Sequence, residues 1–281
     1  MFTRLNAPAK PYSLPLLLFP VLSGLLDPLY GVLAKITSIF WMPKPPARAD
    51  TPRRRCRGLT LVLGGIEGPS QYNYEMVCAV LRSRYRGSVV RVDWNAGIPF
   101  VRSLVNLMHR RHKRHQALRL AQLIVEHHRS YPDSPVCLIA QSGGCYIVVQ
   151  ALEMLPEDVS VHTAVLLAPS ISPGYDISVA SGRCSNGLVS VGGPGDFFFL
   201  GLGTLLFGTS DRVFSPSAGW IGWHHHPPGF IESRWHPSWI RLGYLGNHTT
   251  SSSPRFIATV LAPSFATRRG GLHGSSGIGC S

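Results

Sequence analysis

The stretch VCLIAQSGGCYIVVQAL, residues 136–152, most restricts the folds open to this chain. It has the pattern of a buried strand, a single serine between small residues, and then an apolar helix. Ala140 lies two positions before Ser142, and Gly143 and Gly144 follow it directly. A turn this sharp forces strained backbone angles on its central residue, and large side chains two positions before or after it would collide with the adjacent elements. The pattern is typical of a nucleophile elbow.

Residues 58–265 alternate short apolar runs with longer segments in which apolar residues recur at helical spacing. Strands are predicted over 59–65, 87–94, 135–140, 161–169, 186–193 and 239–246, and helices over 69–85, 103–130, 143–156 and 253–265. Alternating elements of these lengths indicate an α/β fold with a mostly parallel sheet and helices on both faces. The Gly- and Ser-rich tail, residues 266–281, is predicted to be disordered.

Residues 1–57 form an apolar segment followed by a basic linker. Two apolar runs, 14–26 and 29–42, are separated by Asp27 and Pro28, and neither alone reaches the roughly 20 residues of a membrane-spanning helix. Four interpretations stay open: a signal peptide cleaved after ARA (47–49), a transmembrane anchor, an interfacial hairpin held against anionic lipid by RRRCR (53–57), or an arm packed on the domain itself. We expect membrane association through residues 12–42, on an undetermined side, with a cytoplasmic location as the second choice.

The chain is strongly basic, with 27 Lys and Arg residues against 14 acidic ones and a net charge of +13. Such a surface attracts anions, but no helix-turn-helix, zinc-finger or RNP-like pattern accompanies the charge, so nucleic acid is not an expected partner. The six cysteines show no metal-ligand spacing, and three adjacent histidines, 224–226, cannot all face one ion from regular structure. We therefore expect no metal. The oligomeric state is not predicted.

A nucleophile elbow requires an acid and then a histidine downstream, each at the C-terminal end of a later strand. Asp196 follows the predicted strand 186–193 behind a Gly/Pro-rich turn, and His248 follows the predicted strand 239–246. Asp176, which follows the strand 161–169, is the alternative acid. The histidines within 109–115 and those of EHH, residues 126–128, lie on a predicted helix and are expected on its solvated face. The order of the chain therefore predicts Ser142, Asp196 or Asp176, and His248 as one site.

Two segments are candidates for binding an oxyanion. Gly143 leaves the N–H that follows the serine unobstructed, at the positive end of the next helix. The turn LGGIEG, residues 63–68, follows the first strand and offers the N–H of Ile66 or Gly65 as a second donor. An ordinary glycine turn into a helix explains the same residues equally well.

From Leu59 to Phe265 the chain resembles the α/β-hydrolase superfamily, in particular bacterial hydrolase-like proteins with an H-S-G-G elbow, a D-W pair after the second strand, and L-L-A-P followed by S-P-x-Y-D. These motifs are AQSGG, Asp93-Trp94 and LLAPSISPGYD in this sequence. Ala140-Gln141 replaces the usual Gly-His, a departure that costs little because alanine still fits and the second position is variable. The long aromatic segment 197–237 lies where the family carries a variable lid.

The resemblance implies a serine hydrolase in which Ser142 is the nucleophile, His248 the general base and Asp196 the orienting acid, with Gly143 and Ile66 as oxyanion donors. No metal or organic cofactor is implied. The expected substrate is a small-molecule carboxylic ester or thioester, and the apolar lid and N-terminus favour a lipid-like one. The alternative is a catalytically inactive scaffold or binding protein of the same fold at a membrane.

Overall fold

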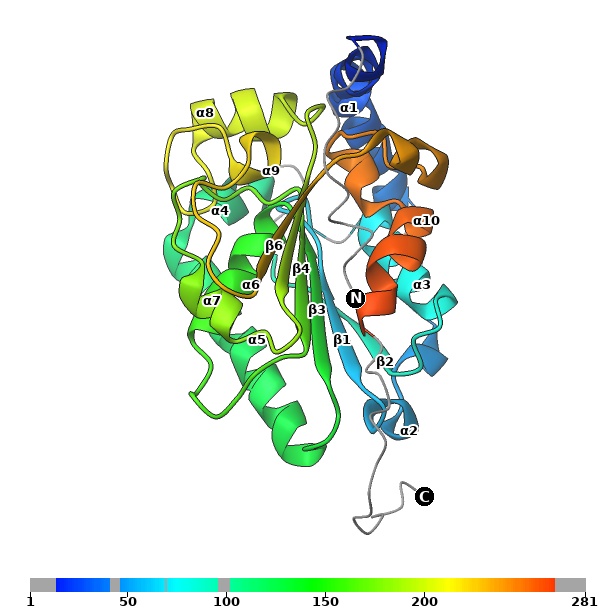
Figure 1. The fold of residues 1–281 in the computed structure, drawn as a ribbon, viewed down its shortest axis with the longest axis vertical. Helices are drawn as coiled ribbons and strands as arrows, with labels where there is room; N and C mark the ends of the chain where they lie inside the picture. Colours follow the sequence, from blue (N-terminus) through cyan, green and yellow to red (C-terminus); the bar gives the residue numbers. More distant parts are fainter. Residues whose placement is uncertain (1–13, 41–45, 69, 96–101, 266–281) are drawn as a thin grey trace.

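A six-stranded sheet forms the centre of the molecule (Figure 1). The computed structural model describes residues 14–40, 46–68, 70–95 and 102–265. The strands lie in the order β2-β1-β3-β4-β5-β6, and all neighbouring pairs are parallel. They are β1 (Leu59–Leu63), β2 (Ser88–Val92), β3 (Val136–Gln141), β4 (Thr163–Leu167), β5 (Leu188–Gly192) and β6 (Phe230–Arg234). The predicted α/β fold is confirmed.

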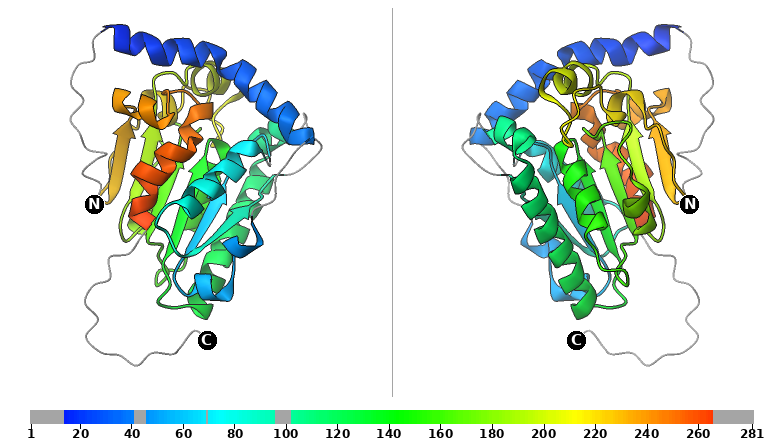
Figure 2. Two further views of the ribbon diagram at one scale, coloured as in Figure 1. Left: turned by 90° about the vertical axis from the view of Figure 1, so that its right-hand side faces the viewer. Right: turned by 90° about the vertical axis from the view of Figure 1, so that its left-hand side faces the viewer.

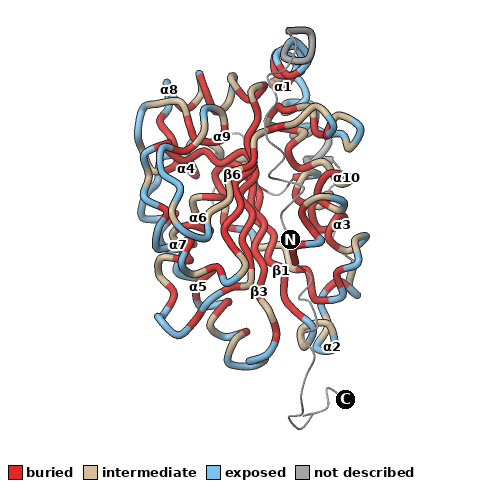
Figure 3. The backbone as a smooth tube through the Cα atoms, in the orientation of Figure 1, coloured by how far each residue is buried: buried red, intermediate tan, exposed pale blue. Residues whose placement is uncertain are grey.

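The sheet has an apolar core on each face. Successive residues of a strand point to opposite faces, so Leu138 and Ala140 of β3 belong to one core, whereas Cys137 and Ile139 belong to the other. Figure 1 shows helices α4 to α7 beside one face and α3 and α10 beside the other. Because both faces are covered, β1, β3, β4 and β5 are buried along their whole length, as Figure 3 shows, and carry no polar alternation.

The helices are α1 (Leu14–Phe40), α2 (Pro52–Arg55), α3 (Gln71–Arg82), α4 (Arg102–Met108), α5 (Arg110–Ser130), α6 (Gly143–Glu153), α7 (Ser178–Gly182), α8 (Thr204–Phe207), α9 (Ala218–Ile221) and α10 (Pro254–Phe256). Shorter 3-10 or π turns are η1 (Ala47–Ala49), η2 (Phe198–Gly203), η3 (Pro237–Leu242), η4 (Thr249–Ser252), η5 (Ile257–Leu261) and η6 (Ala262–Phe265). The predicted helix 103–130 is broken at His109, whose ring nitrogen accepts the N–H of His112 and caps α5. The expectation that its histidines are solvated is wrong for His127, which is buried with its Nε2 3.0 Å from Ser134 Oγ.

The strand predicted over 239–246 is wrong. Residues Pro237–Leu242 form the 3-10 helix η3, which Pro237 starts and which ends at Gly243 with a left-handed φ of 80°. The side chains of Trp239 and Tyr244 then stack, with ring centroids 5.8 Å apart. The sixth strand is β6, which pairs with β5 from inside the segment predicted as a lid, 197–237. The insertion beside the site is therefore shorter than predicted.

The apolar N-terminal segment forms a 27-residue helix, α1, that packs on the domain. It bends as it crosses the molecule (Figure 2). Pro20 and Pro28 lie inside it, and each removes a backbone N–H that would otherwise complete the helical ladder. None of the helices in the described ranges combines the length and hydropathy needed to cross a membrane. Of the four interpretations of this segment, the arm packed on the domain is the one that the structure shows.

Two parts of the predicted domain organisation fall outside the described residues. They are the tail 266–281, predicted to be disordered, and the ends of the N-terminal segment at 1–13 and 41–45.

Candidate active site

Ser142 occupies a strained turn between β3 and α6. Its φ of 52° and ψ of −123° are unfavourable for a residue with a side chain. The turn is held because the N–H of Ser142 donates to the carbonyl of Leu167 on β4, at 2.9 Å. A Cβ on Gly144 would overlap the carbonyl oxygen of Gly64, and one on Gly143 would lie 2.5 Å from Ile66 Cγ2. The small residues that the sequence places after the serine are therefore required by the loop that follows β1.

His248 and Asp196 form a direct pair. His248 Nδ1 lies 2.6 Å from Asp196 Oδ2, and the aspartate is 1% exposed. Asp196 follows β5, and the loop after η3 brings His248 to it because Gly193 and Gly246 let the two backbones approach closely. The alternative acid, Asp176, is exposed and its carboxylate accepts the N–H of Ser178 at 2.9 Å. The structure thus brings Asp196, and not Asp176, to the histidine.

The pair favours the charged imidazole ring. Burial lowers the pKa of His248, but the nearby carboxylates, Asp196 first and then Asp27 and Glu67, raise it, and the net shift is upward. Burial also raises the pKa of Asp196, while the charge of His248 opposes that rise. A carboxylate that stabilises the imidazolium is what a histidine needs when it takes up a proton during a reaction.

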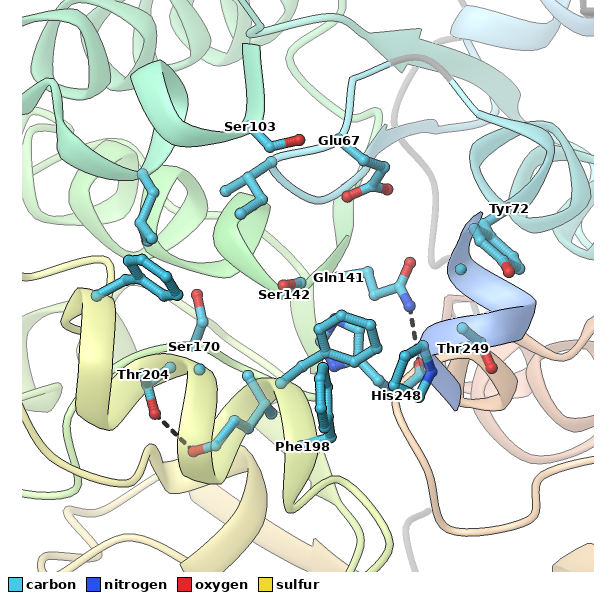
Figure 4. A pocket seen from close by; sticks show the side chains of 18 of the residues that line it. Glu67, Tyr72, Ser103, Gln141, Ser142, Ser170, Phe198, Thr204, His248 and Thr249 are labelled. Carbon is cyan, nitrogen blue, oxygen red and sulfur yellow. Dashed lines mark hydrogen bonds between the residues drawn. The ribbon is translucent and has the colours of Figure 1, made fainter. Parts of the chain in front are cut away.

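Ser142 and His248 line one cavity of about 480 Å³ (Figure 4). In the described part of the chain, no hydrogen bond joins the Ser142 hydroxyl to the His248 ring; the ring of Phe199 lies 5.1 Å from that of His248, centroid to centroid. The apolar walls come from α1, from the loop after β1, from α4 and from the segment 198–208: Pro28, Gly31, Val32, Ile66, Leu107, Phe198, Phe199, Leu200 and Phe207. The cavity therefore combines Ser142 and His248 with mostly apolar walls.

The predicted oxyanion segments lie beside the serine. Ile66 lines the cavity, whereas Gly65 is buried behind it. The indole N–H of Trp94 donates to the carbonyl of Gly64 at 2.8 Å, and the Asn106 amide donates to the carbonyl of Ile66 at 2.9 Å. These two bonds fix the loop from both sides. Among the described residues, neither the N–H of Ile66 nor that of Gly143 has a hydrogen-bond acceptor.

Two residues at the site escaped the sequence analysis. Gln141, treated as a variable position, donates its side-chain N–H to the carbonyl of His248 at 3.0 Å (Figure 4). The same nitrogen lies 3.2 Å from Ser251 Oγ, to which it also donates. Asp27 of α1 accepts the backbone N–H of His248 at 2.7 Å. The sequence did offer a signal for Asp27: a single acid in an apolar run is expected to be buried, and a buried carboxylate requires hydrogen-bond donors elsewhere in the chain. Nothing in the local sequence pointed to the contact of Gln141.

The comparisons with known proteins give distant structural likenesses only. No protein-family model and no curated protein matches the sequence. The solved structure of RedJ with a PEG molecule bound in its active site is 14% identical, with 79% of this chain and 96% of RedJ covered and a TM-score of 0.39. Lipase B of Aspergillus fumigatus is 12% identical, with 84% and 69% covered and a TM-score of 0.38.

The fold follows from the structure of the chain itself. A parallel sheet carries a strained serine directly after a central strand, and an acid and a histidine leave later elements in the chain order Ser142, Asp196, His248. Helices cover both faces, and an insertion between β5 and β6 lies over the serine. This chain has the α/β-hydrolase fold.

Proposed function

We propose that this protein is a serine hydrolase that cleaves a lipid-like ester or thioester through an acyl-enzyme. One observation carries the proposal: His248, which is paired with the buried Asp196 at 2.6 Å, lines the same cavity as a serine on a strained elbow. Strained backbone of this kind persists where function requires it, because it costs about 1–3 kcal/mol.

Each side chain has a defined step in the proposed reaction. With its Nδ1–H donated to Asp196, His248 keeps the Nε2 lone pair for the hydroxyl proton of Ser142, whose oxygen attacks the acyl carbonyl. The N–H groups of Gly143 and Ile66, with Gly65 as the other candidate in that loop, hold the tetrahedral oxyanion. The imidazolium then protonates the departing alcohol or thiol. Water, deprotonated by the same ring, releases the acid and restores Ser142. The serine has to rotate toward His248 when substrate binds, as is common in substrate-free sites.

The apolar lining supports a small-molecule substrate with a hydrocarbon acyl chain. The volume of the cavity is within the range of small-molecule sites, roughly 300–1,000 Å³. Three of its lining residues are also well exposed: Val32 is 56% exposed, Phe207 54% and Phe198 39%. They mark the mouth of the cavity, which lies between α1 and the segment 198–208. A hydrocarbon chain that enters there meets mostly apolar side chains.

We propose, as part of the same function, that the enzyme works at a lipid surface. Helix α1 packs with the small and polar stripe Pro20, Ser23, Gly24 and Asp27 against the domain, and it presents Leu18, Leu22, Leu25 and Leu29 outward at 54–62% exposure. An ordinary surface helix packs its apolar face on the core and exposes its polar face, whereas α1 does the opposite. The net charge of +13 supports attraction to anionic lipid. The side of the membrane is not assigned.

A fluorophosphonate probe tests the catalytic proposal, because it reacts covalently with an activated serine. Labelling of the purified protein that disappears in Ser142→Ala is the expected result. Absence of labelling in the folded wild-type protein would contradict the proposal and leave the inactive scaffold as the better description. Rates on ester series of increasing acyl length then define the substrate, and the proposal expects the longer chains to be preferred.

Co-sedimentation with vesicles tests the lipid surface separately. Vesicles that contain anionic phospholipid are expected to bind the wild-type protein, and the triple variant Leu22→Ser, Leu25→Ser, Leu29→Ser is expected to stay in the supernatant. Equal binding of the two proteins would contradict the role of this face.

A further inference from the structure

Asp27 is a buried acid in an otherwise apolar helix. It is the one acidic residue of α1 and is 1% exposed. Burying a carboxylate is costly unless donors satisfy it. Here Oδ2 accepts the N–H of His248 at 2.7 Å, and Oδ1 accepts both the N–H of Thr249, at 3.2 Å, and the Thr249 hydroxyl. All three donors belong to two consecutive residues, of which the first is the proposed general base.

These donors form the start of the 3-10 turn η4, which begins directly after His248. The first N–H groups of a helical turn have no acceptor within the turn and need one from elsewhere. Asp27 supplies it from a residue more than 200 positions away in the chain. On the other side, the carbonyl of His248 accepts the Gln141 amide at 3.0 Å. The backbone of His248 is therefore held at its N–H by α1 and at its C=O by the residue that precedes Ser142.

The contact of α1 extends along both loops that carry the His248–Asp196 pair. The Asn247 amide donates to the carbonyl of Ser23 at 3.1 Å, and the Ser23 hydroxyl donates to the carbonyl of Leu245 at 3.3 Å. A Cβ on Gly195, next to Asp196, would overlap the carbonyl of Pro20. One face of α1 thus contacts both loops of the His248–Asp196 pair, and Figure 2 shows the helix crossing the molecule at that end.

We propose that Asp27 is a positioning residue of the active site: it holds the backbone of His248 for proton transfer and adds a second carboxylate near the imidazole. The inference rests on the proposed hydrolase function. It makes α1 part of the catalytic site, although the helix precedes the sheet in sequence. Direct contact of Asp27 with substrate is not part of the inference.

The charged and titratable groups around the pair are Asp27 from α1, Asp196 after β5, and Glu67 from the loop after β1, with Tyr72 of α3 and Tyr244 also near Asp27. Asp27 is one of the groups that raise the pKa of His248. Removing its charge while keeping its shape should therefore lower that pKa. Loss of alignment alone would slow the reaction without moving the pKa.

The test compares fluorophosphonate labelling rates of full-length wild type, Asp27→Asn, Asp27→Ala and Ser23→Ala across pH. Ser23→Ala is the matched control, because it removes a hydrogen bond between the same helix and the same loop but no charge. Asp27→Asn and Asp27→Ala are expected to react about 10- to 100-fold more slowly, the scale of a small misplacement of a catalytic group. In Asp27→Asn the midpoint of the rate–pH profile should also move to lower pH, and in Ser23→Ala it should not.

Failure of the proposed function and failure of the role of Asp27 give different results. A wild type that is not labelled contradicts the proposed function, whatever the variants do. A labelled wild type with Asp27→Asn unchanged in both rate and midpoint overturns the role of Asp27 and leaves the hydrolase standing. Thermal unfolding shows which variants fold. If Asp27→Ala does not fold, the near-isosteric Asp27→Asn carries the test, and titration of the His248 ring protons by NMR in that variant must give a lowered pKa for the inference to hold.

Discussion

A single methyl group placed on α1 tests whether this helix packs on the loops that carry Asp196 and His248. We choose Gly24→Ala because a Cβ at position 24 would overlap the carbonyl oxygen of Gly195 and lie 2.7 Å from Phe197 Cε1. The obstacle is backbone on the loop of Asp196, so it cannot rotate aside. Gly31→Ala on the same helix is the matched control: its Cβ would meet only Phe199 Cζ, at the ordinary contact distance of 3.5 Å.

The expected difference in the free energy of unfolding follows from the surroundings of the two glycines. Both substitutions replace glycine by alanine inside a helix and share a gain of about 1 kcal/mol in helix propensity. Gly24→Ala alone adds the cost of overpacking, about 1–3 kcal/mol. The difference in the free energy of unfolding between the variants should therefore be about 1–3 kcal/mol in favour of Gly31→Ala, or roughly 2–4 °C in melting temperature for each kcal/mol.

Thermal unfolding, limited proteolysis within 14–40 and fluorophosphonate labelling measure the consequences together. Gly24→Ala is expected to melt lower, to be cleaved faster in α1 and to label more slowly, because the helix has to move off the Asp196 loop. Gly31→Ala should match or exceed the wild type in stability and be cleaved in α1 no faster than the wild type. If the two variants behave alike in all three measurements, α1 is not docked as described, and the argument for Asp27 loses its basis.

Three further predictions address the acid, the cavity and the fold. Asp196→Asn should reduce the labelling rate by about 10⁴-fold, as for the acid of other Ser-His-Asp triads, whereas Asp176→Asn should leave it unchanged; an active Asp196→Asn would reassign the acid. Gly31→Phe should fill the cavity beside Phe199 and lower the ratio of long-chain to short-chain ester hydrolysis by about tenfold or more, and an unchanged ratio would place the acyl chain elsewhere. Burial lowers the pKa of His127 to about 4, so the unfolded chain binds more protons than the folded one between pH 6.5 and 4. The free energy of unfolding should therefore fall on acidification by up to about 1.4 kcal/mol per pH unit. Urea titrations at pH 7 and pH 5 should show a smaller fall in His127→Gln than in the wild type.

The parts of the fold that sequence predicts well are those in which local pattern and tertiary environment agree. β3 is a continuous apolar run because helices cover both of its faces, and Ser142 stands between small residues because the loop after β1 leaves no room for others. Asp196 could be located because an acid had to follow a strand downstream of the elbow. These inferences need only the neighbours of each residue in the chain.

The features that the sequence analysis predicted wrongly or missed depend on contacts between segments far apart in the chain. Residues 239–246 form a short, mostly apolar run like those of the strands, but Pro237 and Gly243 bound a 3-10 helix there. In contrast, β6 is a short edge strand of mixed polarity that only its pairing with β5 explains. His248 was found despite this error, since it still follows the last strand. Gln141 acts through a partner 107 positions away, and no periodicity encodes such a contact. Contacts between distant segments decide all of these features.

The N-terminal helix shows how one segment meets two requirements that a sequence pattern cannot separate. In sequence, an apolar run with one acid resembles a membrane anchor that a charged residue interrupts. In the structure Asp27 lies with Ser23 and Gly24 on the face of α1 that packs on the domain, and the outward leucines lie on the exposed face. Deleting residues 1–50 would therefore remove a wall of the cavity and the acceptor of the His248 N–H together with the apolar face. Loss of activity on such a deletion is expected even in detergent, where a lipid surface no longer matters, and substitutions on the outward leucines should leave that activity intact. If the truncated protein and the leucine variants hydrolyse a soluble ester equally well, the helix is only an anchor.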